Sequence, residues 1–171
     1  MHPLDVQDAL DGMVILYDTR EHETPKLKKR LQQMNCPAER AHIETGDYSA
    51  KFPLPDGSWY DMRDICCVER KLGLDELCMN FGYKDRERFT AEFERAKKSG
   101  QRLILLVENA TWDKIYLGNY VSKYNSKALV ANILAWLARY DIRLLMCPDY
   151  MSGRVIRDTL YYEGRERLTA L

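Results

Sequence analysis

The sequence has no long apolar run and no excess of charge of either sign. Its 171 residues include 26 basic and 26 acidic side chains, and the pI is about 6.8. No uninterrupted apolar stretch approaches the roughly 20 residues that a membrane span needs. A balanced charge is mild evidence against a general attraction to polyanions, although local basic clusters can still hold phosphates. We therefore expect a soluble protein without a membrane partner.

The sequence also has no C-x-x-C motif and no export signal. The five cysteines are Cys36, Cys66, Cys67, Cys78 and Cys147. An odd set without a C-x-x-C pair signals neither a zinc site nor a disulfide framework. The first residues carry acids where an export signal would carry a basic cluster and an apolar stretch. We expect reduced thiols in the core, and a cytoplasmic location in a prokaryotic or phage host or a nuclear one in a eukaryote.

Glycine and proline are few, with 9 and 6 residues, and no repeat, low-complexity tract or linker interrupts the chain. This length is typical of one domain, which we expect over residues 1–171. Apolar runs of strand length cover residues 13–17, 65–68, 103–107 and 142–146, and residues 40–45 and 48–54 look like two further strands. Helical patterns cover residues 25–34, 74–79, 85–98, 127–140 and 148–160.

The order of these segments predicts an α/β domain. Gly46 and Asp47 join two of the expected strands, and residues 55–58 form a strong turn signal that leads to a partner strand. A hairpin in this part of the chain makes the central β-sheet mixed, whereas the alternating helices flank it on both faces.

Acidic residues follow the apolar strands. Asp18 and Glu21 come after the first strand, Asp47 lies between the next two, and Glu69 and Lys71 end the fourth. Charged groups beside a buried sheet are costly unless opposite charges or a metal ion compensate them. A divalent cation would satisfy several of these carboxylates at once.

Glu69 and Lys71 have the spacing that places two side chains on one face of a strand, with Arg70 facing away. The carboxylate can ligate a hard ion such as Mg²⁺, and the ammonium can orient or deprotonate a water that attacks phosphorus. E-x-K alone is a common pattern, and a solvated strand end with a salt bridge accounts for most examples.

The ordered set of motifs resembles the nuclease domain of the XPF family of structure-specific endonucleases. That family includes the Mus and archaeal Hef nucleases and is a branch of the PD-(D/E)XK superfamily. The matching stretches are Y-D-T-R-E at 17–21, G-D-Y at 46–48, C-C-V-E-R-K at 66–71 with Asp75, L-L-V-E at 105–108 and L-L-M-C-P at 144–148. The likeness spans about residues 13–163 and implies a restriction-endonuclease-like fold.

The resemblance also implies a site. Asp18, Glu21, Asp47 and Glu69 would hold one or two Mg²⁺ or Mn²⁺ ions, and Lys71 would serve the attacking water. Arg20, Arg70 and Asp75 match signature positions and would form charge pairs that fix the site or touch the phosphate. Lys84, Arg86 and Arg88 are assigned to DNA contact, because they follow Gly82 where the family has a basic helix.

These implications favour a metal-dependent DNA endonuclease that cleaves branched, flap or fork DNA in repair or recombination. The alternatives are a catalytically silent DNA-binding or scaffold subunit, and a nuclease with another nucleic-acid substrate. The acids and the lysine are all present, which favours the enzyme. Family members pair through helices of the C-terminal half, so we expect a homodimer. The chain has no helix-hairpin-helix module, so a partner protein could supply targeting.

Other features have ordinary explanations beside functional ones. Lys26, Lys28, Lys29 and Arg30 could neutralise phosphates, but a solvated helix face is the interpretation we favour. Trp112, Tyr116, Tyr120 and Tyr124 could stack on unpaired bases, but we favour a role in covering the sheet edge. His22 follows Glu21 and is expected to be a surface histidine.

Overall fold

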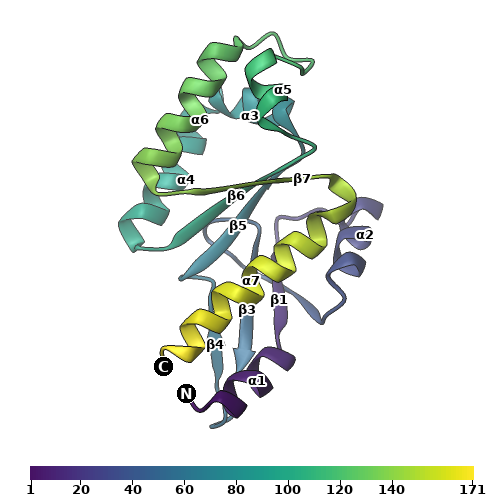
Figure 1. The fold of residues 1–171 in the computed structure, drawn as a ribbon, viewed down its shortest axis with the longest axis vertical. Coiled ribbons are helices and arrows are strands. Elements are labelled where there is room, and N and C mark those ends of the chain that lie inside the picture. The colour runs from purple at the N-terminus through teal and green to yellow at the C-terminus, as the bar shows by residue number, and fades with distance from the viewer. The chain divides into compact units, whose positions relative to one another are not determined.

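The computed structural model describes all 171 residues and divides into two compact units. Unit 1 comprises residues 1–68 and 150–171, and unit 2 comprises residues 69–149. The strands are β1 (Val14–Asp18), β2 (Ala38–Ala41), β3 (Tyr48–Pro53), β4 (Trp59–Asp61), β5 (Cys66–Lys71), β6 (Arg102–Glu108) and β7 (Arg143–Cys147). The helices are α1 (Pro3–Asp11), α2 (Pro25–Met34), α3 (Leu74–Phe81), α4 (Arg86–Ser99), α5 (Trp112–Leu117), α6 (Ser126–Tyr140) and α7 (Ser152–Thr169), with a 3-10 turn at Asp149–Met151. Figure 1 shows their path.

The strands form a seven-stranded mixed sheet in the order β2-β1-β3-β5-β6-β7, with β4 paired to β3. This confirms the expected α/β fold with a mixed sheet and packed helices. The boundary between the units falls within β5, since Val68 belongs to unit 1 and Glu69 to unit 2. The expectation of a single domain stays a prediction.

In unit 1, β1 pairs parallel with β2 and antiparallel with β3. The predicted hairpin is formed by β3 and β4, and its turn uses Gly57 at φ 82°. The prediction of a strand over residues 40–45 is wrong in its extent, because β2 ends at Ala41 and residues 42–47 form a loop. Both strands flanking this loop pair with β1, because the buried apolar side chains of β1 make it the central strand of this half.

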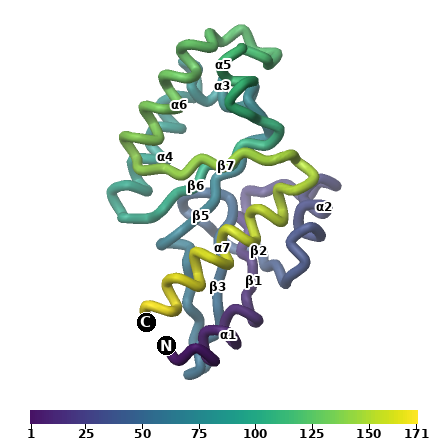
Figure 2. Tube along the Cα trace, in the orientation of Figure 1, coloured from purple at the N-terminus to yellow at the C-terminus, as the bar shows by residue number.

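Helices α1 and α7 pack on β3, and α2 packs on α7. Two glycines of α7 allow this close approach. A Cβ atom at Gly153 would lie 2.2 Å from the carbonyl oxygen of Arg30 in α2, and one at Gly164 would lie 2.3 Å from Phe52 Cζ in β3. A methyl group at either position would therefore separate α7 from its neighbour. Figure 2 shows both chain ends on this unit, close to each other.

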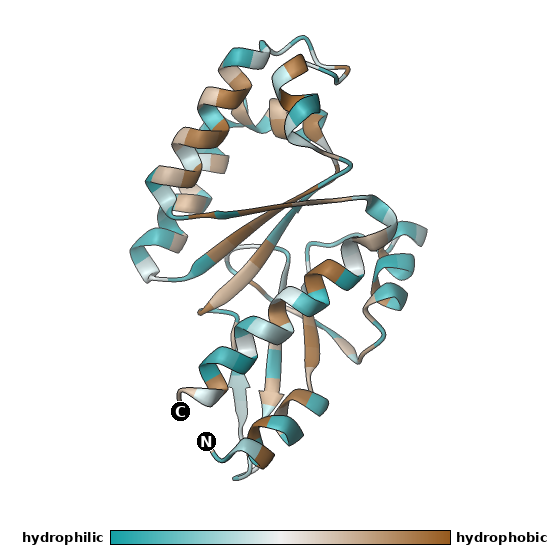
Figure 3. Cartoon of the chain, viewed as in Figure 1, coloured by the Kyte–Doolittle hydropathy of each residue, from teal (hydrophilic) through white to brown (hydrophobic).

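In unit 2, β6 and β7 pair parallel, and α3 and α4 pack against β6. Figure 3 shows the hydrophobic colour along the middle of β6, and every residue of this strand after Arg102 is buried. An aromatic cluster joins the helices around Trp136, which stacks on Phe89 with ring centroids 4.8 Å apart and also contacts Phe81, Phe93 and Tyr140. Trp136 is 4% exposed and belongs to the core of unit 2.

Two short helices, α1 and α5, were not predicted. Each begins at a side-chain cap, His2 for α1 and Thr111 for α5, and each is too short for a clear periodic pattern. Of the aromatic residues expected to cover the sheet edge, Trp112 and Tyr116 lie on α5 and are exposed.

Other boundaries also differ from the prediction. The final helix, expected over residues 148–160, begins at Ser152 and continues to Thr169. The strand expected over residues 65–68 continues as β5 through Glu69 and Arg70 to Lys71. Four of the cysteines are buried free thiols, as expected, whereas Cys36 is partly exposed. None of the helices combines the length and hydropathy that a membrane crossing requires.

Candidate active site

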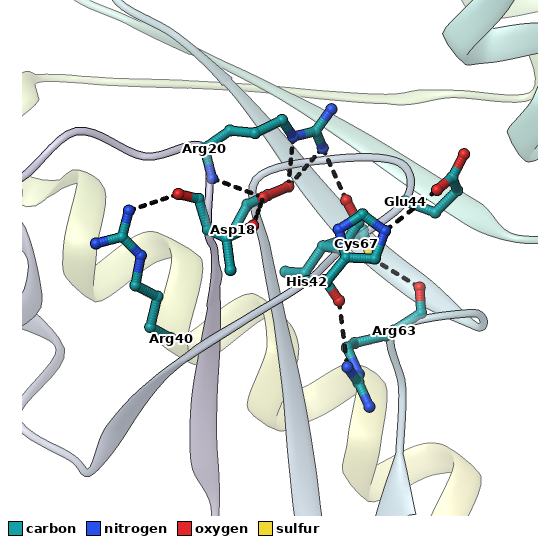
Figure 4. A network of polar contacts seen from close by, with 9 residues as sticks. Asp18, Arg20, Arg40, His42, Glu44, Arg63 and Cys67 are labelled. Atoms are coloured by element: carbon teal, nitrogen blue, oxygen red, sulfur yellow. Dashed lines mark hydrogen bonds and ion pairs between the residues drawn. The ribbon is translucent and has the colours of Figure 1, made fainter.

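Asp18 ends β1 and is almost completely buried, with 1% of the residue exposed. Its Oδ1 atom accepts a hydrogen bond from the backbone N–H of Arg20 at 2.9 Å, and its Oδ2 atom accepts one from the Nε atom of Arg20 at 2.8 Å. The Nη2 atom of Arg20 also donates to the carbonyl oxygen of Ile43 at 2.7 Å. Arg20 therefore joins Asp18 to the loop 42–47, as Figure 4 shows.

The environment of Asp18 keeps its carboxylate ionised. Burial raises the pKa of Asp18, but the hydrogen bonds from the side chain and backbone of Arg20 and the charge of its guanidinium outweigh burial. The net effect lowers the pKa of Asp18 below its ordinary value. Asp18 is consequently an anion throughout the neutral pH range.

The lowered pKa makes a prediction about stability. A carboxyl group with a depressed folded-state pKa stabilises the fold above its unfolded-state pKa, and this contribution is lost as the pH falls through the folded-state pKa. We expect Asp18→Asn to lower the free energy of unfolding by about 2 kcal/mol at neutral pH, since hydrogen bonds to a charged group are lost. Denaturant melts of both proteins between about pH 7 and pH 3 should show this difference shrinking below about pH 4. A difference independent of pH would contradict the assignment.

Glu21 is held by a buried arginine and a buried tyrosine. The hydroxyl group of Tyr48 lies 3.3 Å from Glu21 Oε2, and Nη1 of Arg30 donates to that hydroxyl oxygen at 2.9 Å. The same Nη1 atom lies 3.9 Å from Glu21 Oε2. Tyr48 is fully buried in β3 and Arg30 is 5% exposed in α2. Tyr48 and Arg30 together therefore fix the Glu21 carboxylate.

Arg30 corrects the prediction of a wholly solvated basic face on α2. Lys26, Lys28 and Lys29 are exposed as expected, whereas Arg30 is buried. The helical spacing indicates this burial, because Arg30 lies on the same face of α2 as the buried residues Leu27 and Met34. Arg30 therefore differs in position from Lys28 and Lys29, which precede it in the sequence and are exposed.

Backbone hydrogen bonds place Asp47 beside the end of β1. The backbone N–H of Asp18 donates to the carbonyl oxygen of Asp47 at 2.9 Å. The backbone N–H of Asp47 donates to the carbonyl oxygen of Val68, also at 2.9 Å. Gly46, directly before Asp47, has φ 97°, a conformation that favours glycine. The structure therefore brings Asp18, Glu21 and Asp47 to one end of the strands of unit 1.

Two further arginines anchor the segments around these acids (Figure 4). Nη1 of Arg63 donates to the carbonyl oxygen of His42 at 3.2 Å, and its guanidinium pairs with Asp61 at 2.7 Å. Nη2 of Arg40 donates to the carbonyl oxygens of Thr19 and Glu21. The turn after β1 and the loop that leads to Asp47 are thus held by arginine side chains, which no local sequence pattern reveals.

In unit 2, Glu69 and Lys71 form a buried ion pair at the end of β5. The Nζ atom of Lys71 lies 2.5 Å from Glu69 Oε1, and the two residues are 7% and 6% exposed. The Lys71 ammonium also lies 5.0 Å from the centroid of the Phe89 ring. The predicted same-face geometry is confirmed. Arg70 pairs instead with Glu108 of β6, Nη1 to Oε2 at 3.3 Å.

The other predicted site residues have structural partners or lie on the surface. Asp75 Oδ1 accepts a hydrogen bond from the backbone N–H of Ser122 at 2.6 Å. Arg86 donates to the carbonyl oxygen of Phe81 and to the side chain of Asn132, so it links α4 to α6. Lys84, Arg88 and His22 are exposed. The surface position of His22 is confirmed.

The carboxylates suit a hard divalent cation in their chemistry, because Mg²⁺ and Mn²⁺ prefer oxygen ligands. No group of three or more His, Cys, Asp or Glu side chains is gathered as a metal site would require. Internal partners occupy three of the predicted ligands: Asp18 pairs with Arg20, Glu21 with Tyr48 and Arg30, and Glu69 with Lys71. A metal ion would have to share these carboxylates with their present partners.

The fold is shared with solved structures of known proteins. The chain is similar to XPF from Aeropyrum pernix, with a TM-score of 0.62 at 18% sequence identity over 88% of this chain and 61% of that one. It is equally similar to XPF from Aeropyrum pernix in complex with DNA, with a TM-score of 0.62 at 18% identity over 90% of this chain and 66% of that one. The chain thus spans less than two thirds of the length of either structure.

The sequence comparison identifies the family. The pattern of the ERCC4 domain matches residues 17–157, and the chain belongs to this family. No curated protein sequence matches it. The match includes the candidate residues from Asp18 to Arg88, and the resemblance to the XPF family predicted from the motifs is confirmed.

Proposed function

We propose that the protein is a metal-dependent endonuclease that hydrolyses phosphodiester bonds in branched, flap or fork DNA. The family match and the likeness to an XPF structure solved with DNA support this proposal. The observation that carries it is the buried Glu69–Lys71 pair at the end of an apolar strand. A buried ion pair is weak evidence for stability, because desolvation offsets its Coulombic gain, so its presence at this strand end favours a functional role.

The proposed roles follow the chemistry of each side chain. Asp18, Glu21, Asp47 and Glu69 would hold one or two Mg²⁺ or Mn²⁺ ions. Such an ion would polarise the phosphoryl oxygen and lower the pKa of a bound water. Lys71, steadied by the Glu69 carboxylate and the Phe89 ring, would orient the attacking water at its Nζ atom.

The arginines act on the carboxylates or on the loop that carries one of them. Arg20 holds Asp18 and the loop 42–47, and Arg30 holds Glu21 through Tyr48. In unit 2, Arg70 pairs with Glu108, and Asp75 holds the segment that contains Ser122. We assign the first two arginines to positioning of the proposed metal ligands.

DNA contact is proposed for Arg20, Lys84, Arg86 and Arg88. The side chain of Arg20 is 62% exposed and that of Arg88 is 82% exposed, so both can reach phosphate oxygens. Contacts of this kind position the protein on the backbone of DNA without reading its sequence.

A cleavage panel tests the function directly. Labelled flap, fork, four-way and linear DNA, together with the RNA version of one substrate, are incubated with the protein and Mg²⁺ or Mn²⁺. We expect cleavage near the branch points, its loss in EDTA and its recovery when the metal ion is restored. Binding of branched DNA without cleavage under any metal would favour the silent subunit instead. Preferential cleavage of RNA would favour another nucleic-acid substrate.

A homodimer is proposed as well. The outward side of α6 exposes Leu134, with 45% of its surface accessible, beside Ala131, Ala135 and Ala138. An apolar helix face of this kind suits contact with a second copy. Light scattering should give twice the 20.1 kDa of one chain. A mass of one chain at all concentrations would contradict the pairing. A targeting partner protein stays a prediction.

A further inference from the structure

Unit 2 exposes a group of apolar and aromatic side chains on α5 and the segment that follows it. Trp112, Tyr116, Leu117 and Val121 are 38%, 58%, 79% and 90% exposed, and we name this group the α5 surface. The rings of Trp112 and Tyr116 are neighbours, with centroids 6.3 Å apart and planes inclined by 50°. Large exposed apolar groups of this kind mark an interaction site.

Several contacts fix the position of α5 and of the segment that follows it. Thr111 caps the start of α5, and Gly118 ends it in the left-handed conformation at φ 66°. A Cβ atom at Gly118 would lie 3.5 Å from the Cβ atom of Ser126, so the end of α5 lies against the start of α6. Asp75 holds the connecting segment through the backbone N–H of Ser122. The two rings are therefore presented by an ordered element.

The same anchors connect the α5 surface with the residues of the proposed site that lie in unit 2. Asp75 comes four residues after Lys71 in the chain. The Nζ atom of Lys114 donates to the carbonyl oxygen of Asn109 at 3.0 Å, and Asn109 directly follows Glu108, the partner of Arg70. The α5 surface is thus attached to the ends of β5 and β6, where the Glu69–Lys71 pair lies.

The charges around the α5 surface suit a polyanion. Three lysines, Lys114, Lys123 and Lys127, fall within residues 112–127, and two acids accompany them, Asp113 on α5 and Asp75 against Ser122. Lys123 and Lys127 are exposed. Exposed aromatic rings among basic side chains are typical of surfaces that bind single-stranded nucleic acid, because each base can stack on a ring while its phosphate meets a lysine.

We propose that the α5 surface binds the unpaired nucleotides of a DNA substrate. Bases stack on Trp112 and Tyr116, and the adjoining phosphates contact Lys123 and Lys127. Duplex DNA cannot use the rings in this way, because its bases are already stacked on one another. The proposal deepens the proposed function and rests on it, since the ligand is the single-stranded part of a branched substrate.

Binding without cleavage tests the proposal. The anisotropy of a labelled oligonucleotide of about 12 nucleotides is measured in EDTA, beside a duplex of equal length. We expect Trp112→Ala and Tyr116→Ala each to weaken single-strand binding about tenfold, as loss of one base stack does, and to leave duplex binding within about twofold. Lys123→Gln should reduce the slope of log affinity against log salt by about one.

Trp59→Ala is the matched control. Trp59 is 47% exposed in β4 and carries Lys51 at 4.7 Å from its ring, so it has the same chemistry in unit 1. We expect no change in single-strand affinity for this variant. Equal affinities of Trp112→Ala, Tyr116→Ala and the unaltered protein would overturn the proposal, as would an equal loss of duplex binding.

A fall in molecular mass with Trp112→Ala would instead identify the α5 surface as a contact between copies and would also overturn the proposal. Circular dichroism checks folding, and the variant of the exposed Lys123 serves if an aromatic variant is unstable. Failure here is distinguishable from failure of the proposed function. Cleavage by the unaltered protein is measured in the separate metal-dependent panel, whereas this assay records binding alone.

Discussion

Lys71→Met is expected to abolish cleavage while DNA binding persists. General acid–base groups contribute about 10²- to 10⁴-fold to a rate, so the cleavage rate should fall by at least about 10²-fold. The affinity for branched DNA should change little, because Lys71 is 7% exposed and makes its nearest contacts with Glu69 and Phe89. Single-turnover cleavage with Mg²⁺ and anisotropy in EDTA measure the two quantities separately. Cleavage at the unaltered rate would refute the role of Lys71.

Folding requires its own control for this substitution. Removal of Lys71 takes the nearest cation from the buried Glu69 carboxylate, and breaking a buried ion pair in this way costs about 3 to 5 kcal/mol. The double variant Glu69→Gln with Lys71→Met removes both charges and should regain most of that stability without regaining cleavage. If the double variant were both stable and active, the pair would have no catalytic part.

Arg30→Met is expected to have the second-largest effect, and it acts on stability as well as on cleavage. Arg30 is buried, its Nη1 atom donates to Tyr48, and it lies near Glu21. Its loss leaves a buried hydroxyl and a partly buried carboxylate without this cation, which should lower the free energy of unfolding by about 3 kcal/mol. Chemical denaturation measures this change.

The effect on cleavage separates positioning from simple destabilisation. Because Arg30 holds Glu21 through Tyr48, we expect cleavage by Arg30→Met to need more Mg²⁺ for half-maximal rate, even where the variant is fully folded. Arg30→Lys keeps the charge but not the planar guanidinium, so it should recover only part of this loss. Lys28→Met is the matched control, since Lys28 is exposed on the same helix. A change in stability with an unaltered Mg²⁺ requirement would leave Arg30 a purely structural residue.

The apolar runs predicted most of the strands and the longer helices. β1, β3, β6 and β7 lie within about two residues of their expected bounds, because buried strands need continuous apolar segments. The charged end of β5 was less predictable. Glu69 and Lys71 interrupt the apolar pattern, and their mutual contact in the fold compensates the two charges within the buried strand.

In the candidate site, too, some features could be predicted from the sequence and others could not. The strand period of two predicts that Glu69 and Lys71 share a face, and the structure confirms it. The anchoring of Glu21 by Arg30 depends on α2 and β3, which are separated in the chain and brought together by the sheet. The arginine contacts to the loop before Asp47 have the same origin, since carbonyl oxygens of a loop have no signature in sequence.

The amino-acid sequence alone predicted the fold class and the family, which are confirmed, and proposed the acid and lysine positions of the candidate site, because apolar periodicity and motif spacing are local properties of the chain. The three-dimensional arrangement established which cations accompany those acids, that Arg30 is buried rather than solvated, and that Trp112 and Tyr116 are exposed. These features depend on contacts between segments far apart in the chain, and no local pattern encodes such contacts.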